Sequence, residues 1–261
     1  MYPVLFHLGS LEIRSWGLMV ALGIISGTWL AYREAQRRGM KADLVLDFVI
    51  WAVVAGFLGA RLWEVAFTWG NYAANPLEAL YFWKGGLSIQ GGILGGVVAG
   101  VIFVRKHKLN LWQFADSLAP GIILGQALGR FGCFLNGDAY GMPTDSPLGV
   151  AYVPGTPAYE AFGAQPLFPA ELFEAGWNLV ILGLLLVLRR KKPVDGALFL
   201  LYAILYSVGR FTLEFWRGDS LHILAQFKTA QVASLATVIV AAAFLVWRWL
   251  NRDKRLGNII K

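Results

Sequence analysis

Seven stretches of apolar residues follow one another along the chain, each long enough to cross a lipid bilayer as a helix. They lie at about 17–33, 45–67, 87–104, 113–131, 171–188, 196–215 and 229–249. Since a helix rises about 1.5 Å per residue, about 20 apolar residues span the ~30 Å hydrocarbon core. The pattern predicts an all-α membrane protein, a bundle of seven transmembrane helices that forms one domain over residues 1–261.

The third and fourth stretches are less apolar than the others. The third is rich in glycine (GGLSIQGGILGGVVAG), and the fourth contains Asp116 and Pro120. Small residues let helices approach closely within a membrane, so we expect both stretches to span it. For Asp116 and Gln126 we favour a role in packing the bundle.

Basic residues gather in every second connection between the spans, and this pattern predicts how the chain is oriented in the membrane. Lys and Arg next to a span stay in the cytoplasm. Sixteen of the 23 basic residues follow the first, third, fifth and seventh spans: Arg33, Arg37, Arg38, Lys41, Arg105, Lys106, Lys108, Arg189, Arg190, Lys191, Lys192, Arg248, Arg252, Lys254, Arg255 and Lys261. The connection at about 134–170 has no Lys or Arg. We therefore expect an outer amino terminus, a cytoplasmic carboxy terminus and a small folded cap at the outer face.

Composition narrows the class of protein further. With 57% hydrophobic and 15% charged residues and a mean hydropathy of +0.56, a water-soluble globule is excluded. The net charge of +7 is explained by the cytoplasmic flanks rather than by nucleic-acid binding. One cysteine and three scattered histidines give no metal-ligand spacing, so we expect no metal or cofactor. The amino terminus lacks the pattern of a removable signal peptide, and we expect the first span to act as the anchor.

Polar side chains near the outer ends of the spans are the main indication of a functional site. A charge at the centre of a membrane helix costs about 2.5–3.5 kcal/mol on insertion, so each one needs a partner or a function. The polar residues in this position are Arg61, Glu64, Gln90, Arg130, Glu171, Glu174, Arg210 and Glu214.

Three of these residues are arginines: Arg61, Arg130 and Arg210. Guanidinium groups bind phosphate in a bidentate way, so together they predict a pocket for an anionic lipid head group. Arg210 and Glu214 are four residues apart and share one helical face, where they can pair with each other or with neighbouring helices. The alternative for each arginine is that it only anchors its helix at the interface. For the glutamates it is a counter-ion role, and for Gln90 a hydrogen bond between helices.

The segment GRFGCFLNGDAYG at 129–141 has four glycines in thirteen residues. We expect these glycines to end the fourth span and to let the backbone turn close to a ligand. Asn136 and Asp138 would then direct polar side chains to the membrane surface.

In this segment the chain resembles the prolipoprotein diacylglyceryl transferase family. The family signature is matched at Gly129, Arg130, Gly132, Phe134, Asn136, Gly137 and Gly141. Supporting matches over the whole chain are RSWGLM, GARLWEV, GGLSIQGG, PAELFEA and VGRFTLEFWR.

The resemblance implies a reaction at the outer leaflet of the bacterial cytoplasmic membrane. The lipobox cysteine thiol of a preprolipoprotein attacks the glyceryl carbon of phosphatidylglycerol, and glycerol phosphate leaves. Arg130 and Arg210 would stabilise that phosphate, Arg61 would help to hold the head group, and Glu214 would orient Arg210. Asn136, Gly141 and Glu174 complete the substrate-binding set that the resemblance implies.

The chain also departs from the family at positions that handle protons. Gln90 stands where the family commonly has histidine, and glutamine cannot act as a general base. The signature asparagine is Cys133 and the signature glutamate is Asp138. We place Gln90 and Asp138 in the catalytic set with Arg130 and Arg210, Asp138 as a proton-handling carboxylate or an anchor of the cap. Three aromatic positions also differ: Trp16 replaces tyrosine, and Phe168 and Phe173 replace histidine and tyrosine.

Cys133 and the altered signature leave alternatives open. Cys133 is either a small apolar filler or a nucleophile that forms a covalent intermediate, but no histidine lies nearby in sequence to activate it. The chain itself is either a diacylglyceryl transferase or an altered paralogue that binds phospholipid or lipoprotein precursors, or modifies a different acceptor. A transporter is a third hypothesis, supported by the intramembrane charges alone.

Overall fold

Seven long helices dominate the structure, a computed structural model that describes residues 1–9, 11–82, 85–191, 194–219, 222–224 and 227–251. All seven are long and apolar enough to cross a membrane, which confirms the predicted spans. They are α1 (Ser15–Arg37), α2 (Asp43–Phe67), α3 (Ile89–Lys106), α4 (Leu111–Asn136), α6 (Ala170–Leu188), α7 (Ala197–Leu213) and α8 (Thr229–Leu250). Of the basic residues used for orientation, Lys192, Arg252, Lys254, Arg255 and Lys261 lie outside the described residues.

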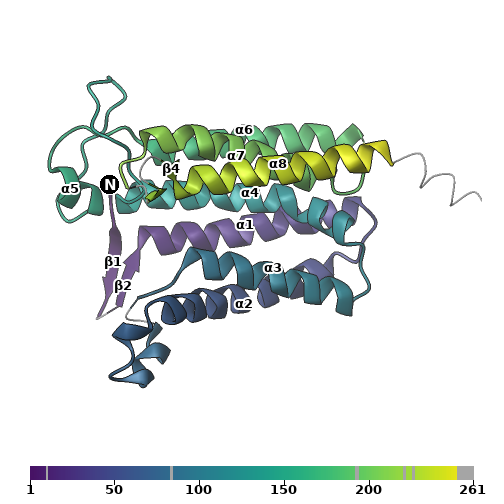
Figure 1. Ribbon diagram of the computed structural model, residues 1–261, viewed down its shortest axis with the longest axis horizontal. Helices are drawn as coiled ribbons and strands as arrows, with labels where there is room; N and C mark the ends of the chain where they lie inside the picture. Colours follow the sequence, from purple (N-terminus) through teal and green to yellow (C-terminus); the bar gives the residue numbers. More distant parts are fainter. Residues whose placement is uncertain (10, 83–84, 192–193, 220–221, 225–226, 252–261) are drawn as a thin grey trace, which may run out of the picture. The chain divides into compact units, whose positions relative to one another are not determined.

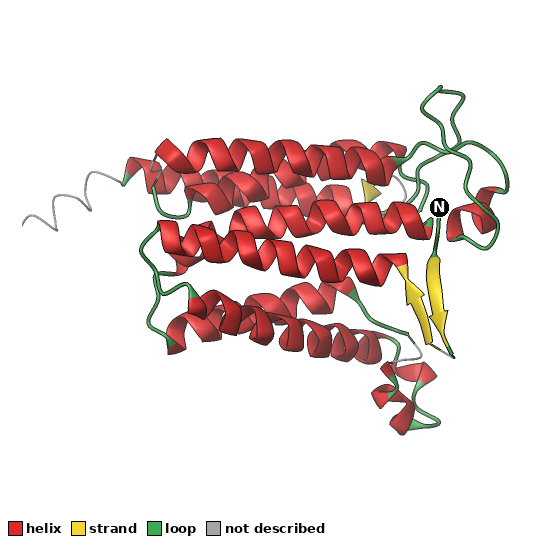
Figure 2. Cartoon of the chain, turned by 180° about the vertical axis from the view of Figure 1, so that it is seen from behind, coloured by secondary structure: helices red, strands yellow, loops and turns green. Residues whose placement is uncertain are grey.

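Shorter elements join these helices (Figure 2). Helix α5 (Pro157–Phe162) lies in the long loop after α4, and two antiparallel ribbons pair β1 (Val4–Leu8) with β2 (Leu11–Arg14) and β3 (His222–Leu224) with β4 (Phe227–Lys228). Single 3-10 turns occupy Trp69–Asn71, Pro76–Leu80, Arg189–Lys191 and Glu214–Trp216. The ribbons are a small addition that the apolar pattern did not predict.

The end of α4 corrects one expectation from the sequence. The helix continues to Asn136, so Gly129 and Gly132 lie inside it and do not end the span. Gly137 ends it with φ of 75°, and its N–H donates to the Cys133 carbonyl at 2.8 Å. A left-handed glycine after the last turn is the usual helix stop, whereas helical glycines keep their backbone hydrogen bonds.

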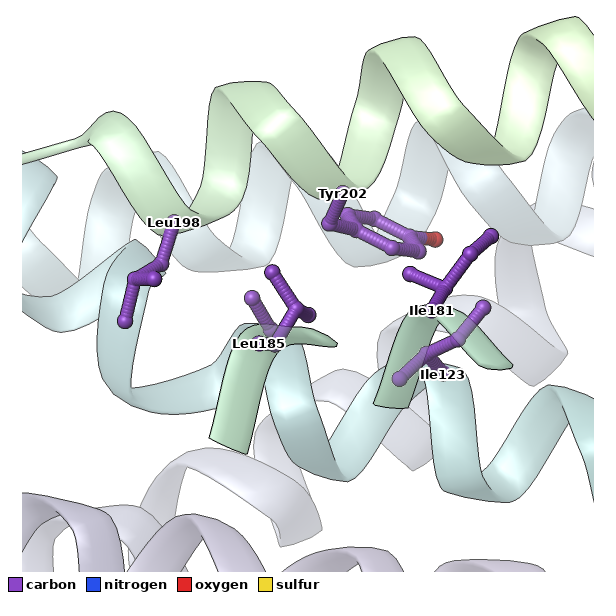
Figure 3. Close-up of a cluster of buried hydrophobic side chains, with 6 residues drawn as sticks. Ile123, Ile181, Leu185, Leu198 and Tyr202 are labelled. Atoms are coloured by element: carbon purple, nitrogen blue, oxygen red, sulfur yellow. The ribbon is translucent and has the colours of Figure 1, made fainter. Parts of the chain in front are cut away.

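The structure divides into two compact units, residues 1–31 with 115–261, and residues 32–114. In the first unit α4, α6 and α7 pack around a buried apolar cluster (Figure 3). Ile123 of α4, Ile181 and Leu185 of α6, and Leu198 and Tyr202 of α7 meet there. Since lipid is as apolar as these side chains, we attribute the cohesion of the cluster to close packing rather than to removal from water.

A buried carboxylate joins α4 to the beginning of α7. Asp116 accepts hydrogen bonds from the backbone N–H groups of Gly196 at 2.8 Å and Phe199 at 2.9 Å. The first N–H groups of a helix lack partners within it and favour negative charge, so Asp116 caps α7 from another helix. Gln126 accepts a hydrogen bond from the Tyr202 hydroxyl at 3.2 Å. The packing role predicted for Asp116 and Gln126 is confirmed.

Glycine contacts bring helices close together in both units. In the first, a Cβ on Gly27 of α1 would lie 2.6 Å from the Gly121 carbonyl oxygen of α4. In the second, a Cβ on Gly91 of α3 would collide with the Gly59 carbonyl of α2. The glycines of the third span therefore serve helix packing, as predicted.

The loop at residues 137–169, called the cap from here on, folds at one end of α4 and α6 (Figure 1). It has a small core of its own, in which Tyr152, Ala158 and Leu167 are buried. Its backbone pairs with the segment after α7, since the Met142 N–H donates to the Trp216 carbonyl at 2.8 Å. The cap is thus a folded segment rather than a linker, as predicted, and it covers the ends of α4, α6 and α7 that carry the polar side chains.

Candidate functional site

Three arginines converge on one carboxylate at the cap end of the first unit. Glu174 of α6 lies with Oε2 2.6 Å from Nε of Arg130 in α4, and with Oε1 2.5 Å from Nη1 of Arg210 in α7. Arg217, just after α7, places Nη1 3.2 Å from the same Oε1. Glu174 is 4% exposed, so these contacts are shielded from solvent. We call these four residues the arginine cluster.

Two further carboxylates balance the charge of the arginine cluster. Arg210 Nη2 lies 2.8 Å from Glu214 Oε2, which confirms the pairing expected from their spacing. Arg217 donates two hydrogen bonds to the Asp219 carboxylate, at 2.8 and 2.6 Å. Burial disfavours the charge on Arg217, but Glu174 and Asp219 outweigh it, so its pKa lies above the ordinary arginine value. With Glu174, these two carboxylates give three negative charges against three positive ones.

Arg130 has the most exposed side chain of the three arginines. Its Nε lies 2.6 Å from Glu174 Oε2, and its side chain is 21% exposed, whereas that of Arg217 is 7% exposed. Tyr206 of α7 lies against the same guanidinium. Because Arg130 is held at its Nε and remains partly exposed, it can receive a phosphate without leaving Glu174.

An apolar groove of about 550 Å³ runs along α6 and α7 beside the arginine cluster. Trp177, Gly209 and Leu213 line it and also line a small recess that contains Glu174 and Arg210. The Trp177 indole lies directly on Gly209, and its N–H donates to the Leu205 carbonyl at 2.9 Å. A charged site that borders an apolar groove suits a ligand with an anionic head and a hydrocarbon tail.

The residues after α4 lie near the arginine cluster. Asn136 donates from Nδ2 to Asp138 Oδ2 at 3.0 Å, and Asp138 lies beside the Cys133 thiol. The other Asp138 oxygen, Oδ1, is buried and has no hydrogen-bond partner among the described residues. The Gly141 N–H donates to the Phe168 carbonyl at 2.9 Å, and a Cβ there would collide with that carbonyl. Gly141 is therefore required for the cap to close over this site.

A second buried pair joins the cap to α6. The Tyr152 hydroxyl donates to Glu171 Oε1, and Glu171 is completely buried. Burial and the neighbouring Glu171 carboxylate raise the pKa of Tyr152, so this phenol keeps its proton and acts as a donor. Phe134 of α4 meets the Tyr152 ring edge-on with centroids 6.4 Å apart.

Arg61 and Gln90 lie in the second unit and form hydrogen bonds within it. Arg61 donates four hydrogen bonds of 2.8 Å to backbone carbonyls, those of Glu78, Ala79, Gly85 and Gly86. Gln90, in the first turn of α3, is exposed and accepts from the Ser88 hydroxyl at 2.6 Å. Arg61 thus holds the segment before α3 in place, while a head-group role for it and a catalytic role for Gln90 stay predictions.

Two residues of this site, Arg217 and Tyr152, were not predicted from the sequence. Arg217 lies beyond the end of α7 in an extended conformation, so helical spacing gave no signal for it. Tyr152 gave no signal, because it comes from an irregular loop. Among the described residues no group of three or more His, Cys, Asp or Glu side chains is arranged to hold a metal ion.

The fold and this site define the class first: a multi-pass membrane protein with a buried arginine site beside an apolar groove. The family model for prolipoprotein diacylglyceryl transferase matches residues 3–247. The chain therefore belongs to the prolipoprotein diacylglyceryl transferase family, as the signature segment suggested.

Individual relatives cover nearly the whole chain. A protein of Bacillus velezensis named phosphatidylglycerol–prolipoprotein diacylglyceryl transferase is 36% identical over 260 residues, which cover 98% of this chain and 96% of that protein. Proteins with the same name from Acaryochloris marina and Thermosynechococcus vestitus are 40% and 42% identical. These matches cover 95% and 90% of this chain, and 91% and 88% of the relatives.

Proposed function

We propose that this chain transfers the diacylglyceryl group of phosphatidylglycerol to the lipobox cysteine thiol of preprolipoproteins. The relatives named above carry this activity in their names. The observation that carries the proposal is the arginine cluster, in which Arg130 is fixed by Glu174 and keeps donors for a phosphate beside an apolar groove.

The chemistry follows from the charges that develop in this reaction. The thiolate sulfur attacks the glyceryl carbon, a C–S bond forms, and the C–O bond to the phosphate breaks with its electron pair on the leaving oxygen. Glycerol phosphate therefore leaves with more negative charge than the phosphodiester carried. We assign Arg130 to bind that phosphate and Arg210, oriented by Glu214, to stabilise it, since prearranged donors at a developing charge are worth about 10²–10³ in rate each.

The remaining predicted residues have supporting roles in this proposal. Glu174 acts on the substrate through the arginines that it holds, Asn136 fixes Asp138, and Gly141 lets the cap approach the site. A head-group role for Arg61 follows only from the resemblance of its segment GARLWEV to the family. No cofactor takes part in the reaction as we propose it.

We place the reaction at the outer leaflet of a bacterial cytoplasmic membrane, in a single membrane domain of 261 residues. The cap has no basic residue, whereas Arg189–Lys191 follow the opposite end of α6. The positive-inside rule then puts the cap and the amino terminus outside and the carboxy terminus in the cytoplasm. Large exposed apolar side chains such as Ile50, Leu62 and Ile239 suit a surface that faces lipid.

Complementation tests the proposed function directly. The chain is expressed in a bacterium depleted of its own diacylglyceryl transferase, together with a reporter lipoprotein that has a lipobox cysteine. We expect mass spectrometry to find thioether-linked diacylglycerol on that cysteine, and none when Arg130 or Arg210 is replaced by Gln. Arg105→Gln is the matched control, because Arg105 is exposed in the last turn of α3. If the chain is folded and inserted in the membrane but leaves the reporter lipoprotein unmodified, the proposal is wrong.

The second candidate is an altered paralogue that binds phospholipid or precursor without this transfer. The observation in its favour is the loss of the family histidine to Gln90, together with Cys133 in the signature. Retention of phosphatidylglycerol by the purified chain, with no product on any lipobox peptide, would favour it over the transferase.

A further inference from the structure

Asn178 of α6 is a buried polar residue that the proposed reaction does not yet use. It follows Glu174 by four residues, so it shares the face of α6 that bears the arginine cluster and lies about 6 Å farther from the cap. The residue is 1% exposed. An asparagine at this depth in a membrane helix normally forms a hydrogen bond to a neighbouring helix.

The amide nitrogen of Asn178 lacks such a partner. Nδ2 is buried and has no hydrogen-bond partner among the described residues. A buried donor without an acceptor costs free energy, and it is rare in native proteins unless a bound molecule supplies the acceptor. The amide carries no charge, so an uncharged oxygen is sufficient as its acceptor.

Asn178 lines a small recess between α6 and α7. The recess has a volume of about 10 Å³, which is about the space that one oxygen atom of a water molecule needs. Glu174 and Arg210 bring the arginine cluster to its wall. Three further residues of the wall also line the apolar groove: Trp177, Gly209 and Leu213. The recess therefore borders both the arginine cluster and the groove.

A glycerophospholipid has an acceptor at the matching position. Its phosphate is followed by two ester carbonyl groups, and the hydrocarbon chains come after them. A lipid whose phosphate lies at Arg130 and whose chain lies along the groove has to place its esters between the two, where the recess is. The recess holds one oxygen atom rather than a whole phosphate group, so an ester carbonyl suits it better than the head group does.

We propose that Asn178 donates a hydrogen bond from Nδ2 to one ester carbonyl oxygen of the lipid substrate. The proposal rests on the proposed transferase function and deepens it, because it names the part of the lipid that is recognised below the phosphate. The ester bonds stay intact during transfer, since only the C–O bond to the phosphate breaks. Asn178 is thus a specificity-determining residue that selects diester lipids over diether lipids, which have no carbonyl group.

Competition between two lipids tests this role. The full-length chain acts on a lipobox peptide in vesicles with equal amounts of diester phosphatidylglycerol and its diether analogue of the same chain length. Mass spectrometry measures the ratio of the two thioether products, which equals the ratio of the two kcat/KM values. A site that binds a polar group rejects a ligand that lacks it, so we expect the diester lipid to be favoured about tenfold or more.

Replacing Asn178 with leucine removes the donor and nearly keeps the size of the side chain. We expect Asn178→Leu to lose about tenfold in rate with the diester lipid and little with the diether lipid, so the product ratio approaches one. The ratio does not depend on how much of the chain is folded. Thr237→Val is the matched control, because Thr237 is exposed on α8 and donates to the Ala233 carbonyl of the same helix at 2.8 Å. This control should keep the preference of the unaltered chain.

The outcomes separate the Asn178 contact from the transferase function. A product ratio near one for the unaltered chain would overturn the contact and leave the transferase intact. An equal loss with both lipids in Asn178→Leu would also overturn it, and would indicate that Asn178 binds a water molecule or only packs the helices. If the unaltered chain makes no thioether product from either lipid, the transferase function and the contact derived from it are both wrong.

Discussion

Replacing Glu174 with glutamine probes the centre of the arginine cluster. The change keeps the shape of the side chain but removes the one negative charge that Arg130, Arg210 and Arg217 share. Arg210 and Arg217 retain Glu214 and Asp219, whereas Arg130 loses its only carboxylate partner among the described residues. Together with Glu214 and Asp219 the arginine cluster is neutral, so the change leaves one net positive charge in this group.

The magnitude follows from burial and from these remaining partners. Removing one partner of a buried ion pair typically costs about 3–5 kcal/mol. The Glu174 side chain is 5% exposed, but Arg130 and Arg210 are 21% and 18% exposed and keep some contact with solvent. We therefore expect the lower end, about 3 kcal/mol of folding stability.

Catalysis should respond differently from binding. An extra positive charge attracts the lipid phosphate, so the KM for phosphatidylglycerol should stay level or fall. Arg130 is no longer oriented, so kcat should fall about a hundredfold, which corresponds to about 2.7 kcal/mol of transition-state stabilisation.

The assay follows initial rates of thioether formation on a lipobox peptide in vesicles with graded phosphatidylglycerol content. Unfolding in detergent is recorded on the same preparations, with Glu160→Gln as control. A Glu174→Gln chain with unchanged kcat and a KM raised tenfold would refute the reasoning, because Glu174 would then contact the substrate directly rather than through the arginines.

Three further changes test other parts of the structure. Arg130→Lys keeps the charge but loses the guanidinium fork, so kcat/KM should fall about tenfold or more in the vesicle assay; full activity would exclude a bidentate phosphate contact. Asp116→Ala leaves two N–H groups of α7 without their acceptor and should cost about 2 kcal/mol or more in denaturant titrations, whereas an unchanged midpoint would exclude its capping role. Gly91→Val forces α3 away from α2, and a normal yield of folded chain would contradict that packing.

The bundle could be predicted from the sequence because its cause is local. An apolar run of about 20 residues has few alternatives to a membrane helix, since every backbone group in lipid has to be paired within the segment. The pair of Arg210 and Glu214 could also be predicted, because the helical period determines which residues share a face. The helix end at Gly137 was not, since four nearby glycines offered equal signals and only one adopts a positive φ.

The site itself depends on contacts that no local pattern encodes. Glu174 and Arg130 are 44 residues apart and meet because α4 and α6 pack together. Tyr152 reaches Glu171 from an irregular loop, and the four carbonyls that bind Arg61 come from another. Sequence reasoning identified the charged residues that need partners, but the folded chain was required to show which partners they have.

The partners of α4 also set an order for assembly of the chain. Asp116 and Arg130 enter the membrane in α4, before Glu174, Gly196 and Phe199 have been synthesised. A charge within a membrane helix is costly unless it has a partner or reaches water. Helix α4 therefore gains these partners for its charges only when α6 and α7 have been synthesised and pack against it. A chain that ends after α4 would therefore hold Asp116 and Arg130 in the membrane without these partners.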